Sequence, residues 1–373
     1  MRILIDATPL LVRSAGVKNF VYYWLSHLKK QSVKDEIAFF PFLRDLGRLD
    51  HQESVSGWLA TFARLQLMGL LNGRDNQALD LLVSRRYDLF HASQLVRNPP
   101  RKCKVTATIY DMTCWLMPEM HTDANVAATK EYAERILRHA DGLIAISEST
   151  RQDSIRILGL REDSIRVIYP GVSDAFFQVT EPDIEGLRQK YAMPDCYLVF
   201  VGCIEPRKNL TRILDAWDLL PLSTRADCQL VAIGPLGWEK SETTARLLGG
   251  GGGVRYLGYV PEEDLPALMA GATALVYPSY YEGFGFPVVQ AMAVGTPVIT
   301  SGVSSLPEIA GDAALFVNPH CTGEISDALR QVLSSASLCQ ALRARGTRRA
   351  EQFRWSRCAK MSLNFFNTIA GGD

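Results

Sequence analysis

The chain has 373 residues, of which 47% are hydrophobic, and this length suggests two domains or one large one. Its 40 basic and 40 acidic side chains cancel, so the composition gives no argument for a nucleic-acid partner. The 8 cysteines are scattered without a C-x-x-C pair, which disfavours zinc sites and thioredoxin-like redox sites. Cys228 and others lie in apolar runs, where we expect small buried thiols, as in a reducing compartment.

The first residues do not resemble a secretion signal, because the apolar run in MRILIDATPL is short and is closed by Asp6. No stretch approaches the roughly 18–20 apolar residues that a membrane-spanning helix needs. We therefore expect a cytoplasmic protein, with at most a peripheral contact at the inner face of a membrane.

Short apolar runs alternate with helical patterns along the whole chain. In the first half, strands are predicted at residues 2–5, 37–42, 89–91, 105–110, 142–146 and 165–168. In the second half, they are predicted at 197–201, 229–233, 254–257, 272–277, 297–300 and 314–317. Helical patterns separate them, for example at 19–30, 125–140 and 209–220. Continuous apolar strands are typical of sheets covered on both faces, so these two series predict an α/β protein with two doubly wound sheets.

A change in composition places the seam between the two halves at residues 171–195, where SDAFFQVTEP is followed by the polar pattern DIEGLRQKYAM. We predict an N-terminal domain over 1–175, a C-terminal domain over 176–355 and a closing helix over 356–373.

Two stretches depart from the alternation of strands and helices. Residues 47–86 have a helical pattern with little strand character, and we interpret them as helices inserted into the first domain. The five glycines at 249–253 lead into a strand rather than a helix, which indicates a flexible turn and not a phosphate-binding loop.

The segment YPSYYEGFGFPVVQAMAVGTPVIT, residues 277–300, is the most informative motif. It reads as a strand end, a thin loop with Glu282 between glycines, a helix and another strand. Pro287 suits the first position of that helix, where its missing N–H costs nothing. A carboxylate and free helix amides therefore lie beyond the carboxyl end of a strand. Open α/β sheets bind ligands there, and helix N-termini favour anionic groups.

A second motif, GCIEPRKN, residues 202–209, follows the first strand of the second half. Arg207 and Lys208 lie beside a helix start, for which Asn209 is a plausible N-cap. A nucleotide diphosphate needs such donors, with no acid close enough to repel it. Glu205 could orient Arg207. The plain alternative is a solvated basic pair at the start of a helix.

The first half offers weaker candidates. Gly16 and Lys18 close the loop DATPLLVRSAGVK, where a backbone amide and a charge could approach a phosphate. Tyr110 can donate one hydrogen bond, and Asp111 could accept one from a hydroxyl group of a ligand, or could simply form a turn. Ser147 reads as the N-cap of a helix.

The histidines and acids do not form a metal site in the sequence. His91 ends a strand and could face a ligand, and His121 lies on a loop that could reach an acceptor. No His/Asp/Glu cluster has metal-ligand spacing, and no Asp-x-Asp lies near a strand end, so we expect no metal. Arg207, Lys208 and helix dipoles would then have to balance the charge of a bound diphosphate.

Together these motifs resemble the retaining glycosyltransferases of family 4. The family has the GT-B fold, in which two Rossmann-like domains face a cleft and a C-terminal helix crosses back to the first domain. The resemblance covers nearly the whole chain and is most specific in its second half. It implies metal-independent transfer of a sugar from a nucleotide sugar to a hydroxyl of a saccharide or lipid-linked saccharide, with no other cofactor. Residues 204–209, 110–111 and 234–238 look most like bacterial mannosyltransferases that use GDP-mannose, while UDP-glucose and other donors remain open.

The resemblance also implies roles for individual residues. Arg207 and Lys208 would hold the diphosphate after Gly202, and Glu282 would accept hydrogen bonds from the donor sugar. Amides and side chains around Glu282 and on the N-terminal domain would complete the donor site: Gly283, Phe284, Gly285, Phe286, Gly16, Lys18 and Tyr110. The base would lie near residues 256–260, including Tyr259 and Val260, and Asp111 would assist catalysis from the N-terminal domain.

Position 290 departs from the family pattern. The family has Glu where this chain has Gln290, in the first turn of the predicted helix, and that Glu chelates the ribose diol. Gln keeps one carbonyl acceptor but replaces the other with a donor amide, so the grip on the ribose is weakened or absent. A catalytically silent nucleotide-sugar-binding protein is therefore an alternative. An epimerase of the same fold and a pyridoxal phosphorylase are disfavoured, because their acid, histidine and lysine residues are not found.

Overall fold

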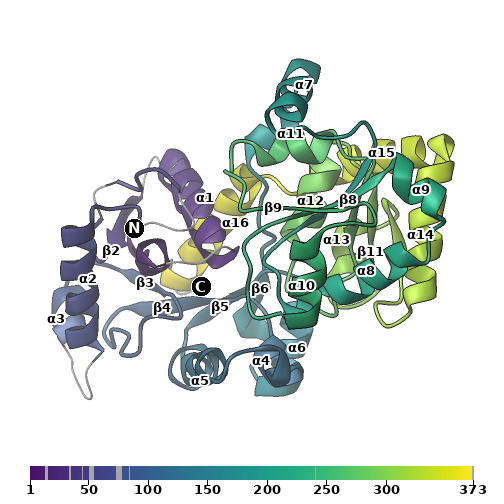
Figure 1. Ribbon diagram of the computed structural model, residues 1–373. Helices are drawn as coiled ribbons and strands as arrows, with labels where there is room; N and C mark the ends of the chain where they lie inside the picture. Colours follow the sequence, from purple (N-terminus) through teal and green to yellow (C-terminus); the bar gives the residue numbers. More distant parts are fainter. Residues whose placement is uncertain are drawn as a thin grey trace. The chain divides into compact units, whose positions relative to one another are not determined.

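The computed structural model describes residues 1–12, 16–32, 35–43, 45–49, 54–72, 78–83, 85–239 and 241–371 (Figure 1). The chain divides into two compact units, Met1–Gly171 with Trp355–Asp373, and Val172–Arg354. The division falls at the start of the predicted seam, and the last helix belongs to the first unit. Among the described residues, no helix is both long and apolar enough to cross a bilayer.

The first unit is built on a sheet of six parallel strands in the order β2-β1-β3-β4-β5-β6. The strands are β1 (Arg2–Asp6), β2 (Glu36–Phe40), β3 (Leu89–Ala92), β4 (Lys104–Ile109), β5 (Gly142–Ala145) and β6 (Ile165–Val167). The helices are α1 (Gly16–Gln31), α2 (Trp58–Leu71), α3 (Ala78–Val83), α4 (Thr113–Leu116), α5 (Asp123–Tyr132), α6 (Glu148–Leu158) and α16 (Trp355–Gly371). Short 3₁₀ turns lie at η1 (Thr8–Leu11), η2 (Pro118–Met120) and η4 (Glu162–Ser164), and a π-helical turn at η3 (Ala133–Leu137).

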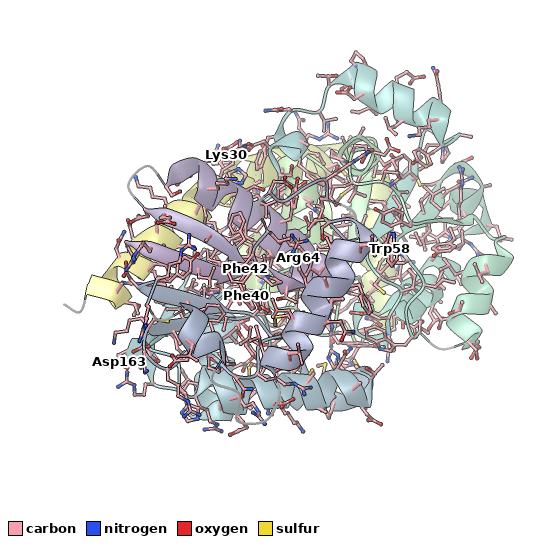
Figure 2. All side chains as sticks on the ribbon, turned by 90° about the vertical axis from the view of Figure 1, so that its left-hand side faces the viewer. Lys30, Phe40, Phe42, Trp58, Arg64 and Asp163 are labelled. Carbon is pink, nitrogen blue, oxygen red and sulfur yellow. A yellow bond between two sulfur atoms is a disulfide. The ribbon has the colours of Figure 1, made fainter. Side chains whose placement is uncertain are left out.

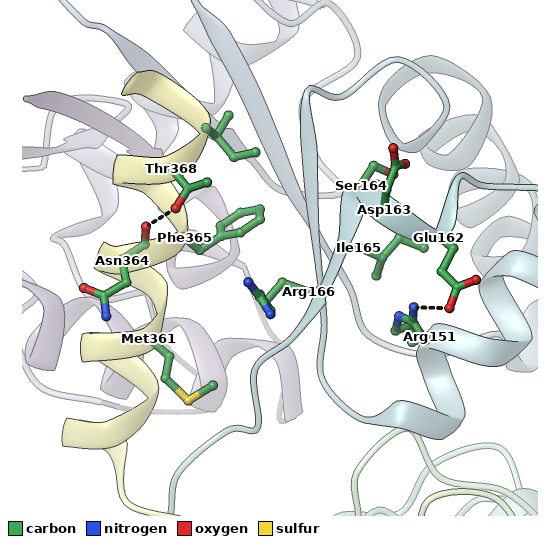
Figure 3. A pocket seen from close by; sticks show the side chains of 11 residues that line it. Arg151, Glu162, Asp163, Ser164, Ile165, Arg166, Met361, Asn364, Phe365 and Thr368 are labelled. Atoms are coloured by element: carbon green, nitrogen blue, oxygen red, sulfur yellow. Dashed lines mark hydrogen bonds and ion pairs between the residues drawn. The ribbon is translucent and has the colours of Figure 1, made fainter. Parts of the chain in front are cut away.

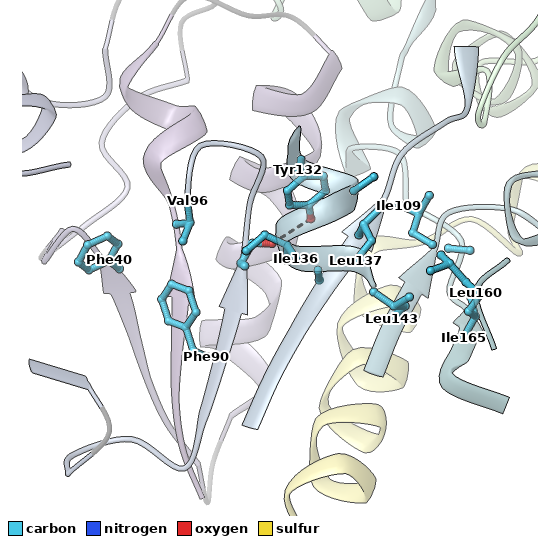
Figure 4. Packing of buried hydrophobic residues seen from close by; sticks show 14 of the residues in the cluster. Phe40, Phe90, Val96, Ile109, Tyr132, Ile136, Leu137, Leu143, Leu160 and Ile165 are labelled. Carbon is cyan, nitrogen blue, oxygen red and sulfur yellow. Dashed lines mark hydrogen bonds between the residues drawn. The ribbon is translucent and has the colours of Figure 1, made fainter. Parts of the chain in front are cut away.

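Figure 4 shows part of the core that holds this sheet, with Phe40, Phe90 and Ile109 among its buried side chains. Tyr132 joins the core from its helix and donates its hydroxyl to the carbonyls of Ala92 and Thr108, 3.3 and 3.2 Å away. Each such large apolar side chain contributes roughly 1.5–3 kcal/mol by leaving water. The central strands β3 and β5 are buried along their whole length, as their continuous apolar sequences predict, whereas the edge strands β2 and β6 are partly exposed.

The second unit has the same architecture, with six parallel strands in the order β12-β11-β10-β7-β8-β9. The strands are β7 (Tyr197–Val201), β8 (Gln229–Ile233), β9 (Val254–Gly258), β10 (Ala274–Tyr277), β11 (Val298–Ser301) and β12 (Ala314–Val317). The longer helices are α7 (Glu181–Lys190), α8 (Leu210–Asp218), α10 (Ser241–Gly249), α12 (Phe286–Ala293), α14 (Thr322–Ser334) and α15 (Ala336–Ala350). Shorter ones are η5 (Asp174–Phe177), η6 (Pro206–Lys208), α9 (Leu222–Asp227), α11 (Leu265–Ala270) and α13 (Leu306–Ala310).

The strand order creates a topological switch point in each sheet. In the second unit, β7 lies between β8 and β10. The chain continues from β7 to β8 on one side, whereas it continues from β10 to β11 on the opposite side. Ligands of open α/β sheets bind in the crevice that such a switch leaves outside the carboxyl ends of the strands. The two motifs at 202–209 and 278–285 follow β7 and β10 directly.

All twelve predicted strands are confirmed, but some helices differ. The helix predicted over 125–140 is interrupted, since α5 ends at Tyr132 and continues as the π-helical turn η3. The helices predicted within 47–86 are present as α2 and α3 in the described part of that segment.

The expectation of an unpaired thiol at Cys228 is wrong. Cys228 is joined to Cys196 by a disulfide, with the two Cα atoms 4.7 Å apart. The reason is the register of the sheet, in which Tyr197 lies opposite Gln229 and so places the two preceding residues side by side. Spacing along the sequence could not show this pairing, because the two cysteines are 32 residues apart.

Candidate functional site

The loops after β7 and β10 are tied to each other at the switch point of the second unit. The amide of Tyr280 donates to the carbonyl of Arg207 at 3.0 Å. Asn209 has a left-handed backbone with φ of 64° and donates its side-chain amide to Pro278 and Pro319, at 2.9 and 2.8 Å. Asn209 does occupy the N-cap position of α8, but its side chain makes no capping hydrogen bond. It braces the neighbouring loops instead.

Four charged side chains from these loops form one cluster. The Arg207 guanidinium lies 2.9 Å from Glu282 through Nη1 and 2.7 Å from Glu205 through Nη2. The Lys208 ammonium lies 2.6 Å from the other oxygen of Glu282. The exposed fractions of these side chains are only 8 to 12%. The structure therefore brings Arg207, Lys208 and Glu282 together as predicted, and Glu205 orients Arg207.

The expectation that no acid lies near the basic pair is wrong. Two carboxylates neutralise the two cations, so the cluster carries no net charge without a ligand. Two isolated cations at this depth would pay a large desolvation penalty, and the pairing with Glu282 removes it. Any anion that binds Arg207 and Lys208 must therefore compete with Glu282 for them.

Burial alone would raise the pKa of Glu282, but the charges of Arg207 and Lys208 outweigh it and lower the pKa to about 2. Glu282 is thus fully ionised near neutral pH. An ionised carboxylate is an acceptor only, with two oxygens that can bind hydroxyl groups.

The sequence reasoning missed Tyr277, the last residue of β10. Lys208 donates to the Tyr277 hydroxyl at 2.6 Å, and that hydroxyl donates to Glu282 at 2.9 Å. The Lys208 ammonium also lies 5.1 Å from the centre of the Tyr277 ring. The only signal in the sequence was a tyrosine in place of an aliphatic residue at the end of an apolar strand.

The Glu282 loop is clamped on both sides. Ser304 accepts from the Glu282 amide at 3.0 Å, and Ser305 donates to its carbonyl at 2.9 Å. Phe284 is buried against Phe286 and Phe353, with ring centres 5.1 and 5.6 Å apart. These hydrogen bonds and the buried aromatic rings therefore hold the Glu282 loop in place against the core.

Gly285 is the residue that turns this loop into α12. It has φ of 90°, and a Cβ atom there would lie 2.7 Å from Leu306. The position thus requires glycine on both grounds. The helix begins at Phe286, so Pro287 occupies its second position rather than the first.

Gln290 lies in the second turn of α12, not in the first turn as predicted, because the helix begins at Phe286. It is only 7% exposed. Its backbone carbonyl accepts from the amide of Val294. Its side-chain amide has one acceptor oxygen and one donor group, so it is suited to bind a hydroxyl group of a ligand.

The segment proposed to surround the base lies at the end of β9. Tyr256 donates its hydroxyl to the carbonyl of Gly234 at 2.8 Å, and Val260 is 6% exposed. Tyr259 lies between them, directly after the strand. A Cβ atom at Gly234 would lie 2.0 Å from the carbonyl oxygen of Gly202, so these two loops approach as closely as backbones can. The predicted residues Gly202, Tyr259 and Val260 are thus on the carboxyl edge of the same sheet.

Gly16 and Lys18, two of the predicted site residues in the first unit, both lie in α1. Gly16 is the exposed first residue of α1, and the loop residues just before it lie outside the described ranges. Lys18 is fully buried, and its ammonium donates to the carbonyl of Val12 at 3.3 Å. We expected the charge of Lys18 to be available to a ligand, but in this structure the side chain is buried and binds the carbonyl of Val12 instead.

Tyr110 and Asp111 follow β4 directly. Burial raises the pKa of Tyr110, and the charge of Asp6 raises it further, so the phenol stays protonated. Asp111 accepts from the amide and the hydroxyl of Thr113, at 3.0 and 2.6 Å, which is the turn-forming role. Ser147 accepts from the Thr150 amide at 3.0 Å and is confirmed as an N-cap.

His91 cannot serve as an exposed base, contrary to the expectation that it could face a ligand. Its ring nitrogens contact the hydroxyls of Thr106 and Thr108 at 2.9 and 3.0 Å, and Trp24 and Phe366 pack against it. Burial lowers the pKa of His91 to about 3. The histidine is therefore neutral and part of the core.

A pocket of about 760 Å³ in the first unit lies away from all these motifs (Figure 3). Its walls include Arg151, Arg166 and Phe365, with Arg151 paired to Glu162 at 2.7 Å. It surrounds Ile165, the first residue of β6, and so lies at the amino end of a strand. Because α/β sheets bind ligands at the carboxyl ends, this pocket is not assigned to the site. Among the described residues, no group of three or more His, Cys, Asp or Glu could hold a metal ion.

The low pKa of Glu282 predicts an acid-sensitive contribution to stability. Its pKa rises from about 2 in the folded chain to the ordinary value of 4.5 on unfolding. This contribution is complete above pH 4.5 and is lost as the pH falls through 2. It amounts to about 3 kcal/mol at ~1.4 kcal/mol per unit of pKa. Chemical denaturation across this pH range should show the loss in the wild type and not in Glu282→Gln; equal slopes in the two proteins would contradict the assignment.

Comparison with known proteins identifies the family of the chain. Residues 183–349 match the family model "Glycosyl transferases group 1", and residues 15–176 match "Glycosyltransferase Family 4". The chain is 31% identical to O-antigen chain mannosyltransferase B of Escherichia coli, over 99% of this chain and 100% of that protein. It is 29% identical to the serotype-specific mannosyltransferase WbdA of Escherichia coli, over 62% of this chain and 29% of that longer protein.

Solved structures show the same fold at low sequence identity. Sucrose-phosphate synthase of Thermosynechococcus elongatus aligns over the full length of both chains, with a TM-score of 0.74 and 18% identity. The lipopolysaccharide glycosyltransferase WaaG aligns with a TM-score of 0.70 and 17% identity, also over both full lengths. With two Rossmann-like units, a full-length relative and both family models in agreement, the chain belongs to glycosyltransferase family 4 and is a glycosyltransferase of the GT-B fold.

Proposed function

We propose that this enzyme transfers mannose from GDP-mannose to a hydroxyl of a saccharide or lipid-linked saccharide, with retention and without a metal ion. The observation that carries the proposal is the cluster of Arg207, Lys208 and Glu282 at the switch point of the second unit. It offers cations for a diphosphate and a carboxylate for sugar hydroxyls within one buried site. The choice of mannose rests on the mannosyltransferases among the relatives.

In the proposed ground state, the diphosphate takes Arg207 and Lys208 from Glu282. The Arg207 fork and the Lys208 ammonium suit phosphate oxygens. Glu282, released from part of its ion pairing, accepts hydrogen bonds from the sugar hydroxyls. The amides from Gly283 to Phe286, at the N-terminus of α12, face the same sugar. Gln290 binds one ribose hydroxyl, and residues around Tyr259 and Val260 lie against the base.

In the transfer step, the bond between the anomeric carbon and the phosphate oxygen breaks, and its electron pair stays on the diphosphate. The acceptor oxygen forms a bond to the anomeric carbon on the same face, and its proton passes to the leaving phosphate oxygen. Arg207 and Lys208 stabilise the charge that develops on the diphosphate, so no separate base is required. In the first unit, Gly16, Lys18 and Tyr110 are the proposed candidates for donor contacts, and Asp111 is the proposed acceptor of a hydrogen bond from a sugar or acceptor hydroxyl.

A thermal-shift screen of GDP-mannose, GDP, UDP-glucose and UDP tests the donor. A ligand at 100 times its Kd stabilises the folded state by ~2.7 kcal/mol, so GDP-mannose should raise the Tm by several degrees. UDP-glucose at the same concentration should have little effect. Stabilisation by UDP-glucose alone would overturn the choice of donor. GDP-mannose that binds without either transfer or hydrolysis would favour the silent binding protein, which Gln290 otherwise supports.

We also propose a peripheral contact with an anionic bilayer through one face of α2. Figure 2 looks onto this helix, with Trp58 and Arg64 labelled. The exposed fractions of Trp58, Leu59, Phe62 and Leu70 are 76, 64, 59 and 70%. The helix contains no acid, and its one cation, Arg64, donates to the carbonyl of Pro41 at 3.2 Å. So much apolar surface on one helix marks an interaction site.

The charge around α2 favours lipid as the occupant. The described residues between positions 42 and 102 include seven basic and three acidic side chains, whereas the whole chain is neutral. Basic residues near a bilayer each contribute about 1 kcal/mol with anionic lipid, and Trp, Phe and Leu side chains enter its interface. A two-fold pairing of this face with a second copy would instead place two positively charged surroundings side by side.

Vesicle sedimentation tests this surface, using phosphatidylcholine alone or mixed with phosphatidylglycerol. The wild type should sediment with the anionic vesicles, and Trp58→Ser/Phe62→Ser should not. The matched control is Leu219→Ser/Leu222→Ser, which removes two comparably exposed apolar side chains from the second unit, 58 and 76% exposed. Equal binding by all three proteins would contradict the proposal. A dimer that only the α2 variant abolishes would assign the surface to a second copy.

A further inference from the structure

The Tyr277 hydroxyl lies between the two groups that the proposed mechanism must separate. It accepts from Lys208 at 2.6 Å and donates to Glu282 at 2.9 Å, while Lys208 and Glu282 also pair directly at 2.6 Å. The three groups thus form a closed triangle. Tyr277 is only 1% exposed and ends β10, so its ring is held by the sheet.

This arrangement fixes a side chain that would otherwise be flexible. A lysine has a four-carbon stem and about 2 kcal/mol of rotamer entropy, so a lone ammonium is poorly placed for a phosphate. Here the Tyr277 ring lies 5.1 Å from Lys208 Nζ, and its hydroxyl fixes the direction of one N–H.

The hydroxyl also matters when Lys208 turns to a ligand. A buried carboxylate that loses a partner pays a large penalty unless another donor remains. Burial and the charge of Glu282 raise the pKa of Tyr277 well above its ordinary value, so its proton stays in place. The Tyr277 hydroxyl can therefore go on donating to Glu282 after Lys208 has moved away. This remaining hydrogen bond lowers the free-energy cost of moving Lys208 from Glu282 to the ligand, and it keeps the Glu282 carboxylate aligned.

We propose that Tyr277 is a positioning residue that strengthens the binding of the nucleotide diphosphate by holding Lys208 and by keeping Glu282 paired when Lys208 engages the phosphates. The proposal rests on the function proposed above. Its class of ligand is a nucleoside diphosphate, and its effect should be absent for a nucleoside without phosphates.

The second unit supplies a matched control in Tyr197, on the neighbouring strand β7. Tyr197 is also fully buried, and its hydroxyl donates to the carbonyl of Leu268 at 2.6 Å. Tyr197→Phe therefore removes one buried hydroxyl without touching the charged cluster. A purely structural role of Tyr277 predicts the same behaviour for the two variants.

The test measures binding of GDP and guanosine to the wild type, Tyr277→Phe and Tyr197→Phe. Tyr277→Phe should weaken GDP by about tenfold, as expected for a lost hydrogen bond to a charged group. Guanosine should bind all three proteins alike, and Tyr197→Phe should bind GDP like the wild type. An unchanged ratio of GDP to guanosine affinity in Tyr277→Phe would overturn the inference.

A double-mutant cycle with Lys208→Met tests the route of the effect. If Tyr277 acts through Lys208, Tyr277→Phe should change GDP affinity by less than about twofold once Lys208 is Met. A full tenfold effect in that background would overturn the inference. Failure of the proposed function looks different, because the wild type itself would then bind GDP no better than guanosine.

Discussion

Glu282→Gln should lower kcat/KM for sugar transfer at least ~100-fold, equivalent to ~2.7 kcal/mol of transition-state stabilisation. The substitution keeps the shape of the side chain but removes the charge that pairs with Arg207 and Lys208. It also replaces one of the two acceptor oxygens with a donor NH₂ group, so only one oxygen remains to accept hydrogen bonds from the sugar hydroxyls. The drop should appear mostly in kcat, because a diphosphate can still bind two cations that no longer have Glu282 as a competitor.

Glu205→Gln is the matched control for this experiment. Glu205 and Glu282 are both 6% exposed, and both pair with Arg207, but only Glu282 also contacts Lys208 and Tyr277. Glu205→Gln should therefore lower kcat/KM less than about tenfold, as loss of one orienting hydrogen bond does. Steady-state kinetics of transfer, with thermal unfolding to verify folding, measures both. A folded Glu282→Gln enzyme with an effect no larger than that of Glu205→Gln would refute the assigned role.

The positions of the strands could be predicted because their apolar runs are continuous and end at glycine, proline or polar residues. The two motifs after β7 and β10 also indicated a binding site at the carboxyl ends of these strands, but the strand order that creates the switch point came from the structure. What could not be predicted was pairing across the sheet. The contact of Glu282 with Arg207 and Lys208 joins residues 74 or 75 positions apart, and only the adjacency of β7 and β10 brings them together.

The errors have the same origin. Asn209 lies at the predicted N-cap position of α8, but its side chain donates to carbonyls of the loops after β10 and β12 and does not cap the helix. His91 at a strand end looked available, yet the side of the strand it faces is covered by α1 and α16. Local patterns fix where an element lies, whereas the direction and the partners of a polar side chain depend on neighbours that are distant in sequence.

Gln290→Glu should raise the affinity for the nucleotide sugar about tenfold while lowering the stability of the ligand-free enzyme by ~1–3 kcal/mol. The gain comes from a second charged acceptor for the ribose diol. The cost arises because position 290 is 7% exposed, so the substitution places a carboxylate charge in a buried position. Binding of the ligand would relieve that cost, so the difference in Tm between bound and free enzyme should widen in the variant.

Gln290→Met separates the ribose role from packing. It keeps the length of the side chain and removes both polar groups, so it should weaken nucleotide binding several-fold and leave stability within ~1 kcal/mol of the wild type. Calorimetric Kd values with GDP and Tm values with and without GDP provide the measurements. If all three proteins bind GDP equally, Gln290 does not touch the ribose. The enzyme then holds its donor through the diphosphate, the sugar and the base alone, and the departure from the family's glutamate carries no cost in affinity.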